Sequence, residues 1–202
     1  QLLLGKLEVA SYWPVDISGE ALARAAGHLS AEYPALDVTA AELDFTAADG
    51  FAPLLPHLPA SGRRLVYYPG SSIGNAGPAE AVDLLKAFRT LAGNDGGLLI
   101  GFDLKKDAAR LHAAYNDAAG VTAAFNLNML TRINREFGGN FKLSTFEHHA
   151  FYNRERSRIE MHLASVRRQK VRVDGETIDF RAGETIHTEN SYKYTVDSFR
   201  AR

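Results

Sequence analysis

The hydrophobic pattern of this chain changes its period near Gly138-Gly139, and this change limits the folds that the chain can adopt. Before that point, short apolar runs alternate with segments whose apolar residues recur at helical spacing. After it, apolar and polar residues alternate one by one, as they do on strands with one buried face. The sequence therefore predicts an α/β part followed by a smaller α+β lobe, in which two helices precede this point and strands follow it.

In the first part, strand-like runs alternate with amphipathic helical segments. This alternation is typical of a parallel sheet with crossover helices. The run Arg64–Tyr68 breaks at Pro69-Gly70, after which we expect a helix to open at Pro78. The expected strands cover 11–16, 36–45, 64–68 and 97–103, and the expected helices cover 18–32 and the segment from 78 onward.

The second part begins with two predicted helices and continues with strands. The helices are expected over 107–117 and 121–137, the latter with a buried stripe of Ala124, Leu127, Leu130 and Ile133. Alternating segments predict strands over 146–152 and 158–164. Asp174-Gly175 predicts a tight hairpin turn, because glycine adopts positive φ readily and aspartate tolerates it. We interpret this part as a lobe laid over the mouth of the sheet.

The composition excludes several classes of partner. There are 23 Lys and Arg against 24 Asp and Glu, and the basic residues are scattered, so nucleic acid is not an expected partner. No apolar run is long enough to span a bilayer, and the first residues lack the features of a signal peptide. Without Cys there is no disulfide or thiolate chemistry. We expect a soluble, cytoplasmic monomer with no membrane partner.

Acidic residues stand at two predicted strand ends, where open parallel sheets bind ligands. Asp16 is placed to hold ribose hydroxyls, but it could equally cap the helix that begins near Ser18. Asp44 could accept from an adenine amino group while Phe45 covers the base, or the two could be a turn aspartate and a core phenylalanine. The residues alone leave both choices open.

Five blocks of the sequence carry a resemblance to a known family. They are Tyr12-x-Pro14-Val15-Asp16-Ile17-Ser18, Tyr68 to Asn75, Asp103 to Asp107, Ala114 to Asn128, and Glu184 to Tyr194. Together they resemble the histidine-specific methyltransferases of ergothioneine biosynthesis, and the match covers nearly the whole chain. The methyltransferase modules of ovothiol-type enzymes share some of this pattern.

This resemblance implies a class I methyltransferase with a Rossmann-like parallel sheet, S-adenosylmethionine as cofactor and L-histidine as small-molecule substrate. The implied reaction trimethylates the α-amino group to give hercynine. Asp16 would bind the cofactor ribose, Asp44 and Phe45 would hold the adenine, and Gly70 would lie against cofactor and substrate.

The resemblance also implies a set of substrate-binding residues. Asn75 and Tyr115 would fix the substrate carboxylate, and Glu189 and Ser191 would contact the two imidazole nitrogens. This last pair suits a neutral imidazole, which has one donor and one acceptor nitrogen. The full implied set is Ser72 (where the family often has Thr), Asn75, Tyr115, Phe125, Met161, Glu189 and Ser191.

Each of these residues also has an ordinary structural interpretation. Asn75 could cap the turn before Pro78, and Tyr115 could be a packed helix residue. Met161 in a strand is more often core than pocket. Glu189 and Ser191 could simply face solvent.

The sequence predicts neither a metal site nor a catalytic base. Glu147-His148-His149 lacks the spacing of a helical zinc site, and no Cys is available. Methyl transfer to an amine depends mostly on positioning, so we expect solvent to take the protons.

One departure from the family pattern concerns the glycine-rich loop. The first strand and this loop would precede the strand that ends at Asp16, yet only the single Gly5 occurs there. We therefore expect an internal fragment. Its cofactor domain, 1–105, would lack the first strand and loop; its substrate-binding lobe would cover 106–194; and 195–202 would begin the return to the first domain. The alternatives are a methyltransferase for another amino acid or amine, or a non-catalytic binding fragment.

Overall fold

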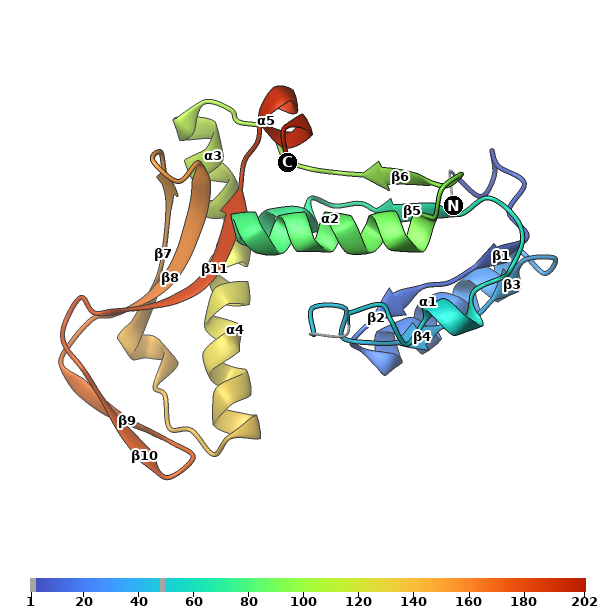
Figure 1. Ribbon diagram of the computed structural model, residues 1–202. Coiled ribbons are helices and arrows are strands. Elements are labelled where there is room, and N and C mark those ends of the chain that lie inside the picture. The colour runs from blue at the N-terminus through green and yellow to red at the C-terminus, as the bar shows by residue number, and fades with distance from the viewer. Residues whose placement is uncertain (1–2, 48–49) are drawn as a thin grey trace. The chain divides into compact units, whose positions relative to one another are not determined.

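The computed structural model describes residues 3–47 and 50–202, a mixed α/β chain (Figure 1). It divides into two compact units. The first comprises the residues up to 66 together with 84–98, and the second comprises 67–83 together with 99–202. These units do not follow the expected boundary at residue 105, and the functional division into domains stays a prediction.

The first unit contains helix α1 and four very short strands. α1 spans Gly19–Glu32, and Ser18 caps it by accepting a hydrogen bond from the Ala21 amide at 3.3 Å. The strands pair in parallel, β1 with β3 and β2 with β4. Pro14, which has no amide hydrogen, separates β1 from β2. The bounds are β1 Ser11–Tyr12, β2 Val15–Asp16, β3 Asp37–Val38 and β4 Ala41–Glu42, followed by the 3-10 helix η1 Leu55–His57.

Strands β5 (Leu65–Tyr68) and β6 (Gly97–Ile100) pair with each other, and helix α2 (Pro78–Ala92) connects them in sequence. The Gly97 amide donates to the Arg64 carbonyl and the Gly101 amide to the Tyr68 carbonyl, each at 2.9 Å. Residue numbers on both strands increase in the same direction between these two hydrogen bonds, so β5 and β6 are parallel. The predicted parallel pairing of strands is confirmed. Over the described residues, however, the parallel strands form separate two-stranded sheets rather than one continuous sheet.

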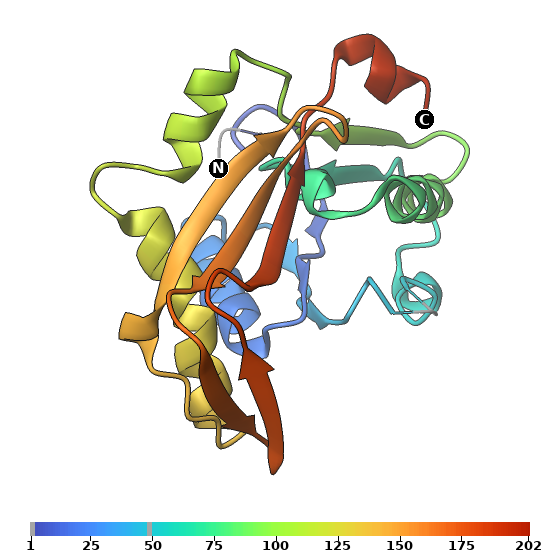
Figure 2. The ribbon, with the colours of Figure 1, turned by 90° about the vertical axis from the view of Figure 1, so that its left-hand side faces the viewer.

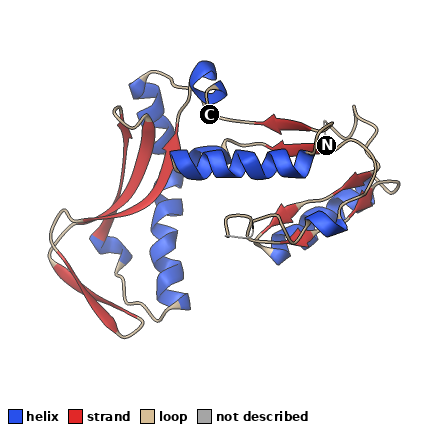
Figure 3. Cartoon of the chain, viewed as in Figure 1, coloured by secondary structure: helices blue, strands red, loops and turns tan. Residues whose placement is uncertain are grey.

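The second unit is built on an antiparallel sheet in the order β11-β8-β7. β7 spans Phe146–Asn153, β8 spans Arg158–Ser165 and β11 spans Thr185–Tyr192, and Figure 2 shows them side by side. β11 carries a bulge between His187 and Glu189. These strands are far longer than β1 to β4, as Figure 3 makes visible.

A hairpin of β9 (Gln169–Val173) and β10 (Glu176–Phe180) precedes β11. Its two turn residues, Asp174 and Gly175, have φ of 48° and 81°. Positive φ at both positions is the type I′ turn that Asp-Gly favours, so the predicted hairpin is confirmed.

Helices α3 (Ala108–Tyr115) and α4 (Val121–Glu136) contact β7, and α4 also contacts β8. On α4, Leu130 is buried, and Leu127 and Ile133 pack beside it as predicted, whereas Ala124 is exposed and Asn126 is buried instead. The core between α4, the sheet and the hairpin comprises Leu130, Phe141, Phe146, Leu163, Val171 and Phe180. Among the described helices, none has the length and apolar character of a membrane-spanning segment.

Two short helices and a last helix complete the second unit. They are η2 (Ser72–Asn75), η3 (Leu143–Thr145) and α5 (Val196–Arg200). η2 packs on β11, and Gly74 marks the place of closest approach. A Cβ atom there would lie 2.9 Å from the Tyr192 carbonyl oxygen and 3.3 Å from its amide nitrogen.

The first prediction follows from this approach. Gly74→Ala should lower the free energy of unfolding by about 1–3 kcal/mol, because backbone must shift to admit the methyl group. The control is Gly27→Ala on helix α1, because a Cβ atom at Gly27 would have no neighbouring atom within 4 Å. It should raise stability by about 0.5–1 kcal/mol. Urea denaturation measures both, and a neutral Gly74→Ala would show that η2 does not pack tightly on β11.

Candidate active site

A pocket of about 510 Å³ lies within the second unit. Its residues come from the loop after β5, the segment after β6, helix α3 and the end of β11. They are Gly70, Ser71, Ser72, Asn75, Gly101, Phe102, Asp103, Tyr115, Glu189, Ser191 and Lys193.

The loop after β5 has a left-handed backbone at two successive residues. Gly70 and Ser71 have φ of 76° and 65°. The Ser71 hydroxyl accepts a hydrogen bond from the Asp103 amide at 2.7 Å, and a Cβ atom at Gly101 would lie only 3.2 Å from the Gly70 nitrogen. The loop is therefore held directly against the segment after β6, with bare backbone at Gly70 facing the pocket.

Lys193 is the centre of the polar network beneath the pocket. It is only 2% exposed, yet all three hydrogens of its ammonium have acceptors. It pairs with an Asp103 carboxylate oxygen at 3.0 Å and donates to the Tyr115 hydroxyl at 2.9 Å and the Ser191 hydroxyl at 2.8 Å. One buried charge thus joins the segment after β6, helix α3 and β11.

The charge on Asp103 is stabilised from two sides. Its other carboxylate oxygen pairs with Lys106. Burial raises the pKa of the Asp103 carboxyl, but the hydrogen bonds from Lys106 and Lys193 outweigh burial, so this pKa lies below its usual value. Asp103 is therefore ionised at neutral pH and remains an effective partner for Lys193.

Tyr115 ends helix α3, and the neighbouring strand fixes this end. The Tyr115 carbonyl is 2.8 Å from Nε2 of His148 on β7, and His148 Nδ1 is 3.0 Å from the Asn126 amide nitrogen. Because the amide nitrogen is a donor, Nδ1 accepts and Nε2 carries the proton that it donates to Tyr115. The Asn116 side chain adds a hydrogen bond to the Ala150 carbonyl at 3.1 Å.

Glu189 and Ser191 lie on one face of β11, opposite Met161 and Ile159 of β8. The Ser191 oxygen accepts from both Lys193 and Tyr115, which leaves its own proton for a ligand. Glu189 has no hydrogen-bond donor to its carboxyl among the described residues. Burial raises the pKa of this carboxyl, and the Lys193 charge opposes the rise only in part.

The structure brings together most of the predicted substrate residues. Ser72, Asn75, Tyr115, Glu189 and Ser191 all line the pocket, together with Gly70. The Asn75 side chain makes no capping hydrogen bond within the described chain, so its amide is available to a ligand.

Phe125 and Met161 lie elsewhere. The Phe125 side chain is 67% exposed on α4. Met161 is 3% exposed and packs in a core cluster with Leu111, Ala150 and Ile159, as its structural interpretation predicted. Neither is part of the pocket wall here, because Phe125 faces outward from α4 and the side chain of Met161 is used for packing between α3 and the sheet.

The remaining predicted residues belong to the first unit. Asp16 is exposed at the end of β2, where its carboxylate accepts from the Ser18 amide at 2.9 Å, while Ser18 itself caps α1. Asp44 accepts from the amide and hydroxyl of Thr46, which lowers the pKa of its carboxyl. Phe45 stacks on Phe51 with ring centroids 5.5 Å apart. Asp44 is thus a turn aspartate, as its local interpretation predicted, whereas the helix cap is Ser18 and not Asp16. Phe45 is half-buried. Asp16 and Asp44 each keep one carboxylate oxygen outside these contacts.

Sequence reasoning missed five pocket residues: Ser71, Gly101, Phe102, Asp103 and Lys193. Each lies in or beside a block of the family resemblance. The available signal was Lys193, a basic residue set between Tyr192 and Tyr194 where an alternating strand ends.

The sequence is similar to a family of known proteins. The profile described as histidine-specific methyltransferase, SAM-dependent (SAM being S-adenosylmethionine), matches residues 1–202. The chain belongs to this family. It is 44% identical over 188 residues to histidine N-alpha-methyltransferase of Mycolicibacterium smegmatis, and 40% identical over 183 residues to the protein of the same name of Mycobacterium tuberculosis. It is 30% identical over 192 residues to ergothioneine biosynthesis protein 1 of Neurospora crassa.

The aligned segments cover 92%, 90% and 82% of this chain, but 56%, 55% and 21% of the respective relatives. The chain thus spans about half the length of the two bacterial relatives.

The second prediction concerns Lys193 of this methyltransferase family member. Lys193→Met should lower the free energy of unfolding by about 1–3 kcal/mol, because the Tyr115 and Ser191 hydroxyls lose their charged donor in a buried site. Lys106→Met removes the other partner of Asp103. The side chain of Lys106 is 39% exposed, so its loss should cost at most about 1 kcal/mol of unfolding free energy. Equal losses in urea denaturation would mean that Lys193 acts only as a partner of Asp103.

Proposed function

We propose that the protein transfers methyl groups from S-adenosylmethionine to the α-amino group of L-histidine, three times in succession, giving hercynine for ergothioneine biosynthesis. The observation that carries this proposal is the pairing of Glu189 and Ser191 on one face of β11. Family membership and the names of the relatives support the same reaction.

A neutral imidazole needs one hydrogen-bond acceptor and one donor from its site. The Glu189 carboxylate supplies the acceptor. Ser191 supplies the donor, since its oxygen accepts from Lys193 and its own proton has no acceptor among the described residues. The two side chains point to the same side of an extended strand, so a single ring can contact both.

The substrate carboxylate is assigned to Asn75 and Tyr115. Asn75 offers a free amide, whereas the single phenolic proton of Tyr115 is donated to Ser191. Tyr115 can therefore bind the carboxylate only if this proton turns from Ser191 toward the ligand. Lys193 beneath the tyrosine favours this, because its charge lowers the electrostatic cost of a carboxylate in the pocket.

The residues present fit the cofactor of the family. The bare backbone at Gly70 admits a ligand closely, since a Cβ there would meet only the Ser72 hydroxyl, at 3.9 Å. We assign the ribose to Asp16 and the adenine to Asp44 and Phe45, and we assign the parallel strand pairs to a Rossmann-like sheet. When bound, S-adenosylmethionine supplies a methyl group on a positively charged sulfur.

The contribution of the protein is then positioning. Asn75 and Tyr115 hold the carboxylate, Glu189 and Ser191 hold the ring, and the amine between them is aimed at the methyl group. The amine must be unprotonated to attack. No side chain is assigned as base, so its protons pass to solvent.

Mass spectrometry of histidine incubated with S-adenosylmethionine and the purified protein tests this proposal. The expected products are histidine with one, two and three added methyl groups. Calorimetric titration with S-adenosylmethionine and histidine is run in parallel. Binding of both without any methylated product would instead identify a non-catalytic binding protein.

The third prediction addresses the choice of histidine over other amino acids. Glu189→Ala should lower kcat/KM for histidine by roughly ten- to two-hundred-fold, the equivalent of about 1.5–3 kcal/mol for a hydrogen bond to a charged group. Leucine has no ring N–H to offer, so binding it leaves Glu189 unpaired, and the same change should spare or improve its turnover. The measured quantity is the ratio of the two kcat/KM values.

The control is Glu176→Ala, which removes an exposed carboxylate on β10, outside the pocket, and should leave the ratio unchanged. An equal fall for histidine and leucine in Glu189→Ala would show that Glu189 supports the fold or the cofactor rather than the imidazole.

A further inference from the structure

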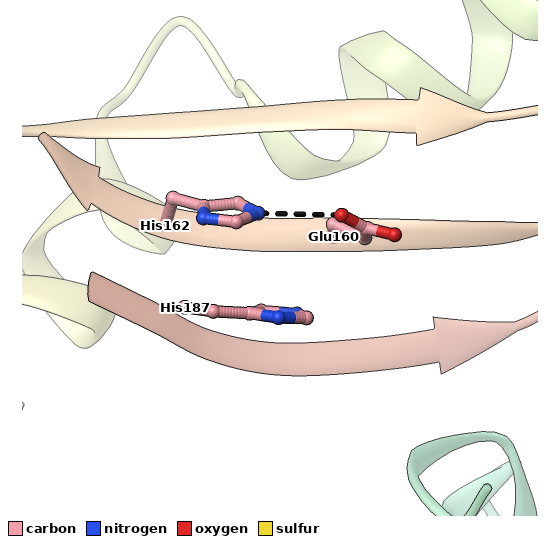
Figure 4. A group of neighbouring side chains, drawn as sticks. All are labelled: Glu160, His162 and His187. Carbon is pink, nitrogen blue, oxygen red and sulfur yellow. Dashed lines mark hydrogen bonds and ion pairs between the residues drawn. The ribbon is translucent and has the colours of Figure 1, made fainter. Parts of the chain in front are cut away.

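We propose that Glu160, His162 and His187 bind a divalent transition-metal ion of the zinc class, at a site separate from the pocket. One potential ligand atom from each residue lies within 4.8 Å of the others. Figure 4 shows Glu160 and His162 on β8 and His187 on the neighbouring β11. This proposal does not rest on the proposed function.

The site lies on the face of the sheet that points away from the pocket. Along β8, Ile159, Met161 and Leu163 face the core, so Glu160 and His162 face the other side. His187 is directly opposite His162 in the strand register. Glu189, beyond the bulge, faces the pocket instead, so β11 carries a different group on each face.

The chemistry of the three side chains suits zinc. Two imidazole nitrogens and a carboxylate oxygen form one of the common ligand sets of zinc sites that keep a fourth position for water. Imidazole ligands also select transition metals over calcium and magnesium, which prefer oxygen ligands alone.

Each histidine has one ring nitrogen beside a partner outside the cluster. His162 Nδ1 lies 3.2 Å from the Thr185 hydroxyl, while its Nε2 faces a Glu160 oxygen at 3.4 Å. His187 Nε2 donates to the Glu189 carbonyl at 3.2 Å, which leaves Nδ1 for a metal ion. Metal-binding histidines commonly donate the second ring N–H to such a partner, which sets the tautomer and the ring direction.

The carboxylate of Glu160 is held in the same manner. Its Oε1 accepts from Arg158 at 2.8 Å and from the Asn153 amide at 3.0 Å. Arg158 also donates to the Tyr192 hydroxyl. Oε2 is therefore the oxygen that is turned toward His162, and the partners of Oε1 keep the carboxylate in place.

Binding requires one movement. The rings of His162 and His187 are stacked, with centroids 4.4 Å apart and planes 14° from parallel. One ion cannot lie in two parallel ring planes, so one ring must turn. His187 is exposed and can do so by giving up its contact with the Glu189 carbonyl, whereas Phe151 stacks on the other side of His162 at 5.5 Å.

Zinc titration of chelator-treated protein by calorimetry tests the proposal. The expected result is one ion per chain, with affinity at least about tenfold lower in His187→Ala, since even the loss of an outer partner costs that much. His149→Ala is the matched control. His149 is exposed and directly opposite His162 on β7, but it is outside the three-residue cluster. The His149→Ala variant should bind zinc with the same affinity as the unmodified protein.

Two further measurements separate a metal site from adventitious binding or lost fold. Zinc at about a hundredfold above its Kd should raise the Tm by roughly 5–10 °C in the unmodified protein and in His149→Ala, but not in His187→Ala. Cobalt(II) should give a visible absorption band typical of tetrahedral sites, which His162→Gln abolishes while circular dichroism stays unchanged. Absence of zinc binding, or equal affinity in His187→Ala, would overturn the assignment whether or not histidine is methylated.

Discussion

A buried ammonium group, that of Lys193, sets the arrangement of the second unit. A charge in a nearly dry site is costly unless each of its hydrogens has an acceptor. Here the acceptors are Asp103, Tyr115 and Ser191, which come from three different elements. The segment after β6, the end of α3 and β11 must therefore meet at one point. The pocket is the space above this meeting point, so its shape follows from the need to satisfy Lys193.

Strand β11 carries separate chemistry on its two faces because a bulge lies between His187 and Glu189. Without the extra residue, strict alternation would place these two side chains on the same face. With it, His187 joins His162 and Glu160 on one side, and Glu189 joins Ser191 on the other. Close packing at Gly74 then holds this part of β11 against η2, which carries Asn75.

Local signals in the sequence predicted the helices well, because each helix start depends on nearby residues. Ser18, Pro78 and Asp107 begin α1, α2 and α3 as expected, and Asp-Gly forms the β9-β10 turn. The strands over 11–16 and 36–45 are shorter than predicted, since pairing partners are set by distant segments. Glu189 and Ser191 are two residues apart, and β11 has them on one face, as the alternation of a strand requires. It could not reveal that Asp103 pairs with Lys193, that Phe125 faces outward, or that three histidines align across β7, β8 and β11.

The polarity of the proposed imidazole site depends on Lys193 more than on Ser191 itself. A serine hydroxyl can donate or accept, so alone it would not distinguish the two imidazole nitrogens. Lys193 can only donate, and it occupies one acceptor position of Ser191 while Tyr115 occupies the other. When the Tyr115 proton turns to the substrate carboxylate, Lys193 still donates to Ser191, whose own proton is available to the ring. Glu189, when ionised, can only accept. A site with fixed donor and acceptor positions rejects ligands that cannot match them far more strongly than a site that selects by size. By donating to Ser191, the buried lysine favours the arrangement in which Ser191 donates to the ring and Glu189 accepts from it.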